Sequence, residues 1–320
     1  MQVAVTDYSF PDLSVESAII QQAGFSLQAW KEKKAAAELP PLVAEADAVI
    51  TQFAPITAEV IASMQRARVI VRYGIGVDNV DLAAAAARRI PVCNVPDYCI
   101  DEVADHTLAF ILATTRQVVP NTLHVRNGHW GLATSLESLK TLKHLTVGLV
   151  GFGRIGQEVA SRLKAFKCRI LVFDPVVPAA TVTAASAVHA TLADVLSQSD
   201  VLSLHCPSTA QTRGLLNSER LSQTKAGVAV INLARGDLID PAALTSALQS
   251  GHVSAAALDV FNPEPIPADH PIRSMPNVIL ASHIASASVP AVKKLRETAA
   301  NLAVMALRGE RLPNVVNGVE

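Results

Sequence analysis

Three polar residues follow apolar, strand-like stretches in the second half of the 320-residue sequence. They are Arg235, Glu264 and His283, and each comes within a few residues of the end of its stretch. In an open parallel sheet, ligands bind outside the carboxyl ends of the strands. We therefore expect the three side chains to face one crevice.

The three residue types complement one another chemically. An arginine can hold a carboxylate through two parallel N–H bonds. A histidine titrates near neutral pH and can exchange a proton with a carbinol oxygen, while a carboxylate beside it favours the imidazolium and fixes the ring. Each residue alone is more often an ordinary surface residue of a loop. Their occurrence together, behind a nucleotide motif, predicts catalysis.

That nucleotide motif follows an apolar run, Leu145 to Val150, which is typical of a buried parallel strand. Gly151, Gly153 and Gly156 come next with G-x-G-x-x-G spacing and open an amphipathic helix. The first glycine permits a tight turn, the second leaves room for a pyrophosphate, and the third lets the helix pack close to the sheet. The helix N-terminus then offers free N–H groups to the phosphates. The alternative is a glycine-rich turn in some other βαβ unit.

A second predicted strand ends at Asp174, whose carboxylate can accept both hydroxyl groups of a ribose. A 2′-phosphate at this position would meet like charge, and the following Pro175-Val176-Val177 supplies no cation to receive it. The pattern therefore predicts NAD (NADH) as cofactor, with NADP disfavoured.

Composition limits the classes of protein that fit. Half of the residues are hydrophobic and 17% are charged, which indicates a globular chain long enough for two domains. The net charge is −1 and no basic block occurs, so we expect no nucleic-acid or membrane partner. No secretion signal or membrane span is apparent. The four cysteines have no zinc-like spacing, so we predict no metal site, reduced thiols and a cytoplasmic protein.

Strand-like and helix-like stretches alternate along both halves of the chain, which predicts two α/β domains. One long helix is expected from Ile100 to Gln117, followed by a polar, irregular segment from Asn121 to Ser138. The final helix, about Pro290 to Leu307, comes after the second sheet is complete. Its position leaves open whether it crosses back to make the first domain discontinuous.

From about Val69 onward the chain resembles the D-isomer-specific 2-hydroxyacid dehydrogenases, in particular the phosphoglycerate dehydrogenase and C-terminal-binding-protein branch. The stretches that carry the resemblance are VRYGIGVDNVDL, VCNVPDYCIDEVADHTLAFIL, VGLVGFGRIGQEVA, NLARGDLIDPAAL, ALDVFNPEP and SHIAS. The resemblance implies a Rossmann dinucleotide-binding domain, residues 99–287, and a smaller flavodoxin-like α/β substrate domain, residues 1–98 and 288–320. It also implies a homodimer built on the nucleotide domain.

The resemblance also implies roles for single residues. Arg235 would anchor the substrate carboxylate, Glu264 would pair with His283, and His283 would act as general acid and base. In the first domain, backbone N–H groups of Ile75 and Gly76 would meet the carboxylate. Arg72 would reach a substrate phosphate or carboxylate, although it is equally well explained as a surface arginine at a strand end.

Cofactor contacts carry over in the same way. The implied set comprises the motif glycines, Arg154 and Ile155 over the pyrophosphate, Asp174 at the adenosine ribose, Cys206 and Pro207 beside the adenine, and Leu233 and Asp259 at the nicotinamide.

Two features depart from the family pattern. Ser282 stands where the family usually has a proline before the histidine, so we expect a looser loop. No regulatory domain follows Glu320, so we expect that the long type of phosphoglycerate dehydrogenase is excluded.

The sequence thus predicts an NAD-dependent oxidoreductase that interconverts a 2-oxo acid and the D-2-hydroxy acid by hydride transfer. Two alternatives stay open. One is a dinucleotide-sensing scaffold like the corepressors of the C-terminal-binding-protein branch. The other is a phosphoglycerate or phosphite dehydrogenase on the same fold.

Overall fold

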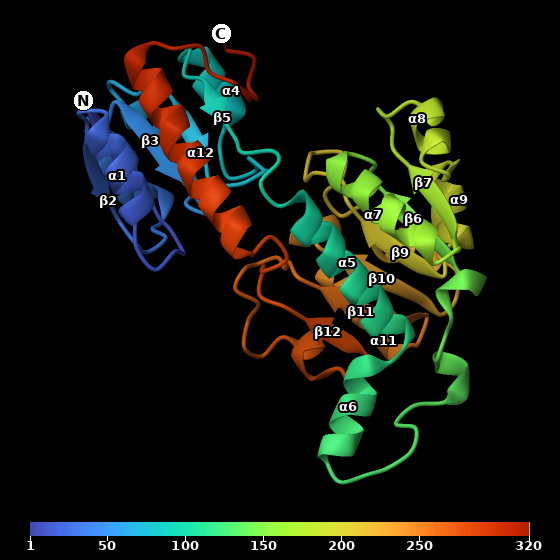
Figure 1. The fold of residues 1–320 in the computed structure, drawn as a ribbon. Helices are drawn as coiled ribbons and strands as arrows, with labels where there is room; N and C mark the ends of the chain where they lie inside the picture. Colours follow the sequence, from blue (N-terminus) through green and yellow to red (C-terminus); the bar gives the residue numbers. More distant parts are fainter. Residues whose placement is uncertain (320) are drawn as a thin grey trace. The chain divides into compact units, whose positions relative to one another are not determined.

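The structure is a computed structural model that describes residues 1–319 and divides into two compact units (Figure 1). The first unit consists of Met1–Tyr98 and the segment that begins at Ser288, and the second unit is Cys99–Ala287. Each unit has its own parallel sheet with helices on both faces, so the predicted α/β fold class is confirmed. No helix among the described residues is both long and apolar enough to cross a bilayer.

The second unit is built on a seven-stranded parallel sheet in the order β12-β11-β10-β9-β6-β7-β8. Counted from β6, this is the Rossmann order 3-2-1-4-5-6 with one further strand at the edge. The strands are β6 (Thr146–Val150), β7 (Arg169–Phe173), β8 (Val188–His189), β9 (Val201–Leu204), β10 (Val228–Asn232), β11 (Val253–Leu258) and β12 (Val278–Leu280).

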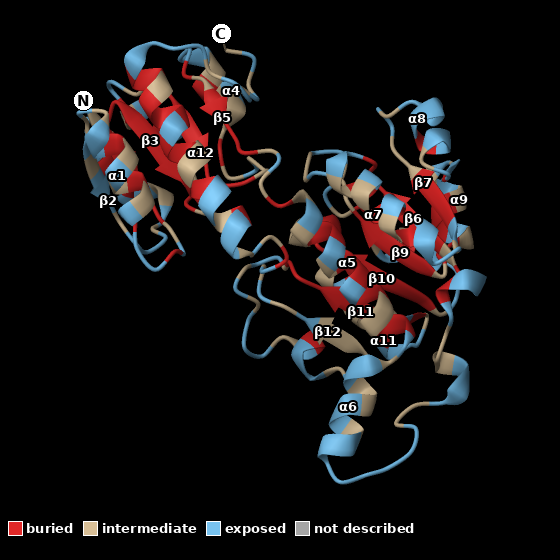
Figure 2. Ribbon diagram, in the orientation of Figure 1, coloured by how far each residue is buried: buried red, intermediate tan, exposed pale blue. Residues whose placement is uncertain are grey.

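Both faces of this sheet are covered, and its central strands are buried along their length (Figure 2). On one face α5 and α7 pack side by side, and α5 also contacts β10 and β11. The other face packs with α9, α10 and α11 into a single apolar cluster. The helices of the unit are α5 (Ile100–Thr115), α6 (Val118–Arg126), α7 (Arg154–Ala165), α8 (Ala179–Ala184), α9 (Leu192–Gln198), α10 (Ser218–Ser222) and α11 (Pro241–Gln249).

The first unit has a five-stranded parallel sheet in the flavodoxin-like order β2-β1-β3-β4-β5. Its strands are β1 (Gln2–Val5), β2 (Ser26–Ala29), β3 (Ala48–Thr51), β4 (Ile70–Arg72) and β5 (Val92–Cys93). Alternate residues of each strand face opposite layers. In β1, Val3 and Val5 pack with α1 and α12, whereas Ala4 packs with α2, α3 and α4. The helices are α1 (Ser14–Gln22), α2 (Pro40–Val43), α3 (Ala58–Ser63), α4 (Leu82–Ala87) and α12 (Val289–Arg308).

The segment after residue 100 differs from the sequence prediction. The expected helix from Ile100 ends at Thr115, because Gln117 adopts a left-handed conformation with φ of 52°. A separate helix, α6, then occupies part of the stretch expected to be irregular, and Pro120 falls in its first turn, where no N–H is needed. The pattern of α6 gives no helical signal because it has no buried residue in this chain.

Strand β2 was not predicted either. Its sequence, Ser26 to Ala29, lies at the edge of the sheet and is mostly exposed, so it lacks the apolar pattern of the other strands. The final helix α12 crosses back to the first unit, where it packs against α1, β3 and β4. This resolves the question that the sequence left open.

Candidate active site

Arg235, Glu264 and His283 all lie in the second unit, beyond the carboxyl ends of β10, β11 and β12. These three strands are neighbours in the sheet, so their ends meet at one edge. The His283 Nδ1 atom lies 2.8 Å from Glu264 Oε2. The structure therefore brings Glu264 and His283 into direct contact, and the positive charge of Arg235 acts on Glu264 as well.

Glu264 is half-buried and held at both oxygens. Its Oε1 accepts a hydrogen bond from the backbone N–H of Phe261 at 2.8 Å, and Oε2 faces His283. Burial would by itself raise the pKa of Glu264. The hydrogen bond and charge of His283, the Phe261 N–H and the charge of Arg235 outweigh it and lower the pKa below its usual value. The Glu264 carboxylate is thus ionised at the near-neutral pH at which a histidine exchanges protons.

A buried carboxylate shapes the loop that carries His283. Asp259 is 1% exposed, and its two oxygens accept hydrogen bonds from the N–H groups of Ile284 and Ala285 at 2.8 and 2.9 Å. The His283 N–H also donates to the Asp259 carbonyl at 2.8 Å. These bonds hold His283 with φ of 58° in the loop where Ser282 replaces the family's proline. The observed contacts of Asp259 are thus to this loop, and its predicted contact with the nicotinamide stays a prediction.

The loop that carries Arg235 depends on two residues that were not singled out as functional from the sequence. Asn232 accepts a hydrogen bond from the Ala234 N–H at 3.0 Å and donates to the Arg235 carbonyl at 2.8 Å, which closes a tight turn. A Cβ atom at Gly236 would lie 2.0 Å from the backbone of Phe261. Glycine therefore lets the Arg235 loop approach the loop of Glu264. The NLARG pattern was the available signal, since an amide and a glycine flank the arginine.

The glycine motif connects β6 to α7 in a tight turn. Gly151 has φ of +99°, and a Cβ there would lie 2.6 Å from the backbone of Cys206. At Gly156 a Cβ would lie 2.5 Å from the Gly151 carbonyl. The close contact that this glycine permits is thus between α7 and the Gly151 turn, whereas the motif predicts a close contact with the sheet. Gly153 precedes the first residue of α7, and a Cβ at this position would meet no atom within 4 Å. The space above the turn is therefore open at the helix N-terminus.

Asp174 follows β7 and accepts three backbone hydrogen bonds, from Phe152, Val176 and Val177, at 2.7 to 2.9 Å. Burial alone would raise the pKa of Asp174, but these three bonds and the charge of His189 lower it. The bond from Phe152 ties the acid to the glycine turn. Asp174 thus presents an ionised carboxylate beside that turn, which suits ribose hydroxyl groups and repels a 2′-phosphate.

The other predicted cofactor residues surround the same strand ends. Arg154 is the exposed first residue of α7, with half-buried Ile155 beside it. Cys206 follows β9 at the close approach to the glycine turn, with exposed Pro207 next to it, and burial raises the pKa of the Cys206 thiol to about 11. The Cys206 thiol is therefore neutral at ordinary pH and suits an apolar contact. Leu233 is buried directly after β10.

These features fit a bound dinucleotide. The open space at Gly153 and the first N–H groups of α7 can receive a pyrophosphate. The carboxylate of Asp174 can receive a ribose. Within residues 1–319, no cluster of three or more His, Cys, Asp or Glu side chains is arranged to hold a metal ion.

The predicted substrate loop belongs to the first unit and follows β4. The Gly74 carbonyl accepts from the Val95 N–H at 3.0 Å, and the Ile75 carbonyl accepts from Asn94 Nδ2 at 2.7 Å. The N–H and C=O of a trans peptide point in opposite directions. The N–H groups of Ile75 and Gly76 therefore point away from residues 94 and 95.

Arg72 ends β4 and is only 8% exposed, so the alternative explanation of a surface arginine at a strand end does not hold. Its guanidinium crosses over Gly74, where a Cβ would lie 1.5 Å from Nη1, and it lies 5.9 Å from the centre of the Phe53 ring. Gly74 has φ of +140°, so glycine is required here both for its conformation and for the space that Arg72 fills. Arg72 thus brings a positive charge to the Gly74–Gly76 loop.

Comparison with known proteins agrees with this geometry. Residues 108–285 match the sequence model of the D-isomer specific 2-hydroxyacid dehydrogenase, NAD binding domain. The chain is 37% identical to D-3-phosphoglycerate dehydrogenase of Mycobacterium leprae over 90% of this chain and 54% of that protein. It is 39% identical to glyoxylate reductase of Thermofilum pendens over 82% of this chain and 78% of that protein. The chain spans about half the length of the curated phosphoglycerate dehydrogenases that it matches.

Among solved structures, D-lactate dehydrogenase from Aquifex aeolicus, complexed with NAD and lactic acid, superposes with a TM-score of 0.85. That structure is 29% identical and covers 96% of each chain. The chain belongs to the D-isomer specific 2-hydroxyacid dehydrogenase family, and its second unit carries the NAD-binding domain. NAD as cofactor agrees with the prediction from the glycine turn and Asp174.

Proposed function

We propose that this protein is an NAD-dependent dehydrogenase that interconverts a 2-oxo acid and the corresponding D-2-hydroxy acid. The observation that carries the proposal is the 2.8 Å contact between His283 Nδ1 and Glu264 Oε2 at the strand ends of the NAD-binding sheet. An imidazole held in this way presents its other nitrogen, Nε2, for proton transfer. The similarity to glyoxylate reductase and to D-lactate dehydrogenase supports the same class of reaction.

In the direction of reduction, Arg235 binds and orients the carboxylate of the oxo acid through its planar guanidinium. When bound, NADH supplies the hydride that adds to the keto carbon. His283 gives a proton from Nε2 to the oxygen of that carbon, and Glu264 stabilises the imidazolium before the transfer. In the reverse direction, neutral His283 takes the proton of the carbinol hydroxyl.

The chain's own residues hold the cofactor in this proposal. The N-terminal N–H groups of α7, with Arg154 and Ile155, bind the pyrophosphate, and Asp174 binds the adenosine ribose. Cys206 and Pro207 line the adenine, while Leu233 and Asp259 adjoin the nicotinamide.

Ile75 and Gly76 have the predicted role of binding the carboxylate of the substrate. Support comes from their carbonyl partners, because Asn94 and Val95 fix the direction of both peptide groups. Consecutive N–H groups that point the same way form a concave site for an anion.

A phosphorylated substrate is a second candidate, and a specific observation favours it. Arg72 brings a buried guanidinium to the same loop, and arginine recognises phosphate as well as carboxylate. The similarity to D-3-phosphoglycerate dehydrogenases agrees with this candidate.

NADH oxidation with a panel of 2-oxo acids tests both candidates. The panel runs from glyoxylate, hydroxypyruvate and pyruvate to phenylpyruvate and phosphohydroxypyruvate, with NADPH in parallel. We expect turnover of at least one acid with NADH preferred, and preference for phosphohydroxypyruvate would favour the phosphorylated class. Tight NADH binding without turnover of any acid would contradict the proposal and favour a dinucleotide-sensing scaffold or phosphite oxidation.

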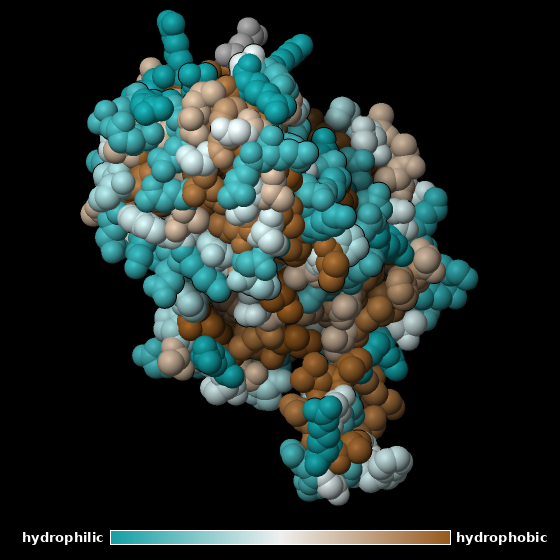
Figure 3. All heavy atoms as spheres, turned by 60° about the vertical axis from the view of Figure 1, so that its left-hand side comes forward, coloured by the Kyte–Doolittle hydropathy of each residue, from teal (hydrophilic) through white to brown (hydrophobic). Residues whose placement is uncertain are grey.

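We also propose a homodimer built on the second unit. Six large apolar side chains between residues 118 and 136 are half exposed or more, namely Val118, Leu123, Val125, Trp130, Leu132 and Leu136. Figure 3 shows apolar side chains gathered over the projecting segment that contains α6. Contiguous exposed patches of this kind mark interaction sites in soluble proteins. Light scattering should give twice the mass of one chain, and a monomeric mass at micromolar concentration would contradict the dimer.

A further inference from the structure

The first unit contains a buried charged group directly beneath the loop Gly74–Gly76. Its members are Glu16 on α1, Arg296 on α12 and Tyr73, which is the residue before Gly74. Glu16 is fully buried, Tyr73 is 1% exposed and Arg296 is 8% exposed. The active-site chemistry proposed above uses none of the three.

Glu16 is the centre of this group. Its two oxygens accept hydrogen bonds from Arg296 Nε at 2.9 and 3.1 Å, and Oε2 also accepts from Arg296 Nη2 at 2.7 Å. Tyr73 Oη donates to Oε1 at 3.1 Å. A buried carboxylate is tolerated only when it is paired and hydrogen-bonded in this way. Arg296 Nη2 also donates to Asp12, to its carbonyl at 2.8 Å and to its Oδ1 at 3.3 Å, and the bond from Tyr73 ties this group to the residue before the loop.

The Tyr73 ring also packs against Phe10, which is itself covered by Arg296. It makes an edge-to-face contact with Phe10, with ring centres 5.3 Å apart, and the Arg296 guanidinium covers the Phe10 ring at 5.1 Å. Burial, together with the charge of Glu16, raises the pKa of Tyr73 well above its ordinary value. The phenol is therefore protonated at every working pH and always donates to Glu16.

Tyr73 is also the last fixed residue before the loop. Its N–H donates to the Thr51 carbonyl at 2.8 Å, which continues the pairing of β4 with β3. Beyond it, the Gly74 N–H donates to the Arg72 carbonyl at 2.9 Å, and on the far side Val95 binds the Gly74 carbonyl and Asn94 binds the Ile75 carbonyl. The near end of the loop thus starts at a residue whose backbone is held by β3 and whose side chain is held by Glu16.

We propose that Tyr73, through its bond to the Glu16–Arg296 pair, is a positioning residue that sets the loop Gly74–Gly76 for binding the substrate carboxylate. This inference rests on the proposed function, because it assumes that the loop N–H groups meet a 2-oxo acid. Helix α12 then has two roles. It packs in the core of the first unit, and its Arg296 orients Glu16, which in turn orients Tyr73.

Two variants separate positioning from stability. Y73F removes the bond to Glu16 and keeps the ring, so we expect the KM for the 2-oxo acid to rise about tenfold, the factor that corresponds to about 1.4 kcal/mol. The kcat should change little. E16Q keeps a hydrogen-bonding partner for the Tyr73 hydroxyl but removes the charge that Arg296 needs. We expect E16Q to unfold at a lower temperature than Y73F and to raise the KM by a smaller factor than Y73F does.

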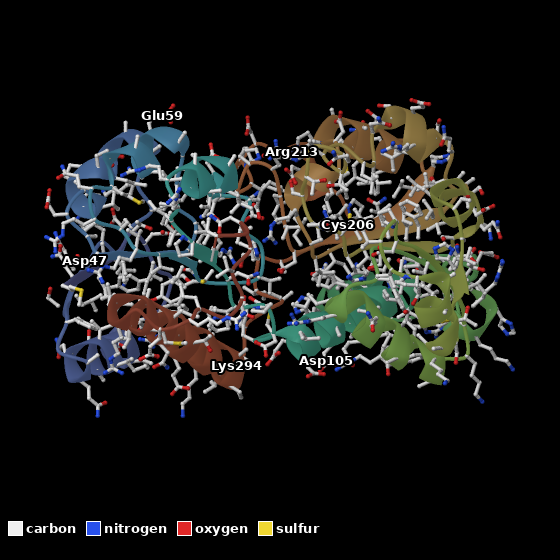
Figure 4. All side chains as sticks on the ribbon, turned by 90° about the horizontal axis from the view of Figure 1, so that it is seen from above. Asp47, Glu59, Asp105, Cys206, Arg213 and Lys294 are labelled. Atoms are coloured by element: carbon white, nitrogen blue, oxygen red, sulfur yellow. The ribbon has the colours of Figure 1, made fainter. Side chains whose placement is uncertain are left out.

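The chain offers a matched control for loss of an ion pair. Arg66 binds Asp47 through three bonds of 2.8, 2.9 and 3.2 Å, and Asp47 is 3% exposed. Asp47 comes directly before β3, at the opposite edge of the sheet from the loop, and is labelled in Figure 4. The R66M variant should therefore lower thermal stability and leave the KM unchanged.

Amide hydrogen exchange tests whether Tyr73 holds the loop Gly74–Gly76, and it needs no substrate. The Val95 N–H binds the Gly74 carbonyl, so its protection reports how firmly the loop is seated, and the Val49 N–H, bound to Val69, reports the sheet. Y73F should speed exchange at Val95 relative to Val49, E16Q should do so to a smaller degree, and R66M should not. If Y73F changes neither this ratio nor the KM, or if R66M raises the KM equally, the inference is wrong. If the wild type reduces no 2-oxo acid but Y73F still speeds exchange at Val95, the proposed function is wrong, while the role of Tyr73 in holding the loop is supported.

Discussion

Two glutamates, one in each unit, are held by a basic partner in opposite ways. Glu264 is half-buried beside His283, whose ring can gain and lose a proton. Glu16 is completely buried against Arg296, which keeps its charge at every accessible pH. The first pair contains a base whose charge would change in the proposed reaction. The second pair contains an arginine, whose charge stays fixed.

Solvent access follows the same division. The side chains of His283 and Glu264 are 29% and 32% exposed, which the proposed contact with a substrate requires. The Glu16 side chain has no exposure, so any change in its charge would leave an uncompensated ion in the core. Comparison of the two pairs teaches that the choice of basic residue and the degree of burial together distinguish a proton-transfer pair from a positioning pair. The predictions below test this difference.

The largest expected effect is on catalysis. The H283N variant should lower kcat for reduction by a factor on the order of 10³, because asparagine cannot supply the proton. The dissociation constant for NADH, measured by fluorescence, should stay close to that of the wild type. A loss of only a few-fold would mean that His283 is not the proton donor.

A smaller effect is expected on stability at the buried pair. R296M should lower the free energy of unfolding by about 3 kcal/mol, because it leaves Glu16 buried without its counter-ion. The control is R162M, which removes an arginine that binds the largely exposed Asp101 and Asp105 and ties α5 to α7. That loss should be about 1 kcal/mol or less. Equal losses in denaturant titrations would contradict the distinction between the buried and the exposed pair.

The smallest effect is expected at Glu264. E264Q should lower kcat/KM about tenfold, and the alkaline limb of the reduction profile should move to lower pH, because the imidazolium loses its carboxylate partner. The pKa of Glu264 lies below its usual value, so its bonds stabilise the fold above that value and are lost as pH falls through the lower pKa. The stability difference between the wild type and E264Q should therefore be full above the ordinary pKa value of 4.5 and shrink as the pH falls below it. A constant difference would contradict the assigned charge state.

Sequence patterns predicted the buried strands of both sheets, because an apolar run is a local signal. Arg235, Glu264 and His283 could be expected at one edge because parallel strands end there. Helix α6 could not be predicted, since a helix with no buried face in its own chain has no apolar periodicity. The exposed edge strand β2 was missed for the same reason.

The Glu16–Arg296 pair was beyond the reach of local patterns because 280 positions separate the two residues. A weak signal was present in each helix. Glu16 lies four residues before buried Ile20 in α1, and Arg296 lies three and four residues before buried Ala299 and Ala300 in α12. A charged residue on the apolar stripe of a helix indicates a buried partner, but it does not say where that partner lies.

The return of α12 to the first unit has a consequence for how the protein is made. The second unit is one continuous stretch, so all of it is synthesised before α12, which begins at Val289. The first unit begins to form earlier but lacks part of its core until α12 emerges. During translation the unit at the N-terminus is therefore the later of the two to complete its core. Until α12 emerges, Glu16 has no contact with Arg296.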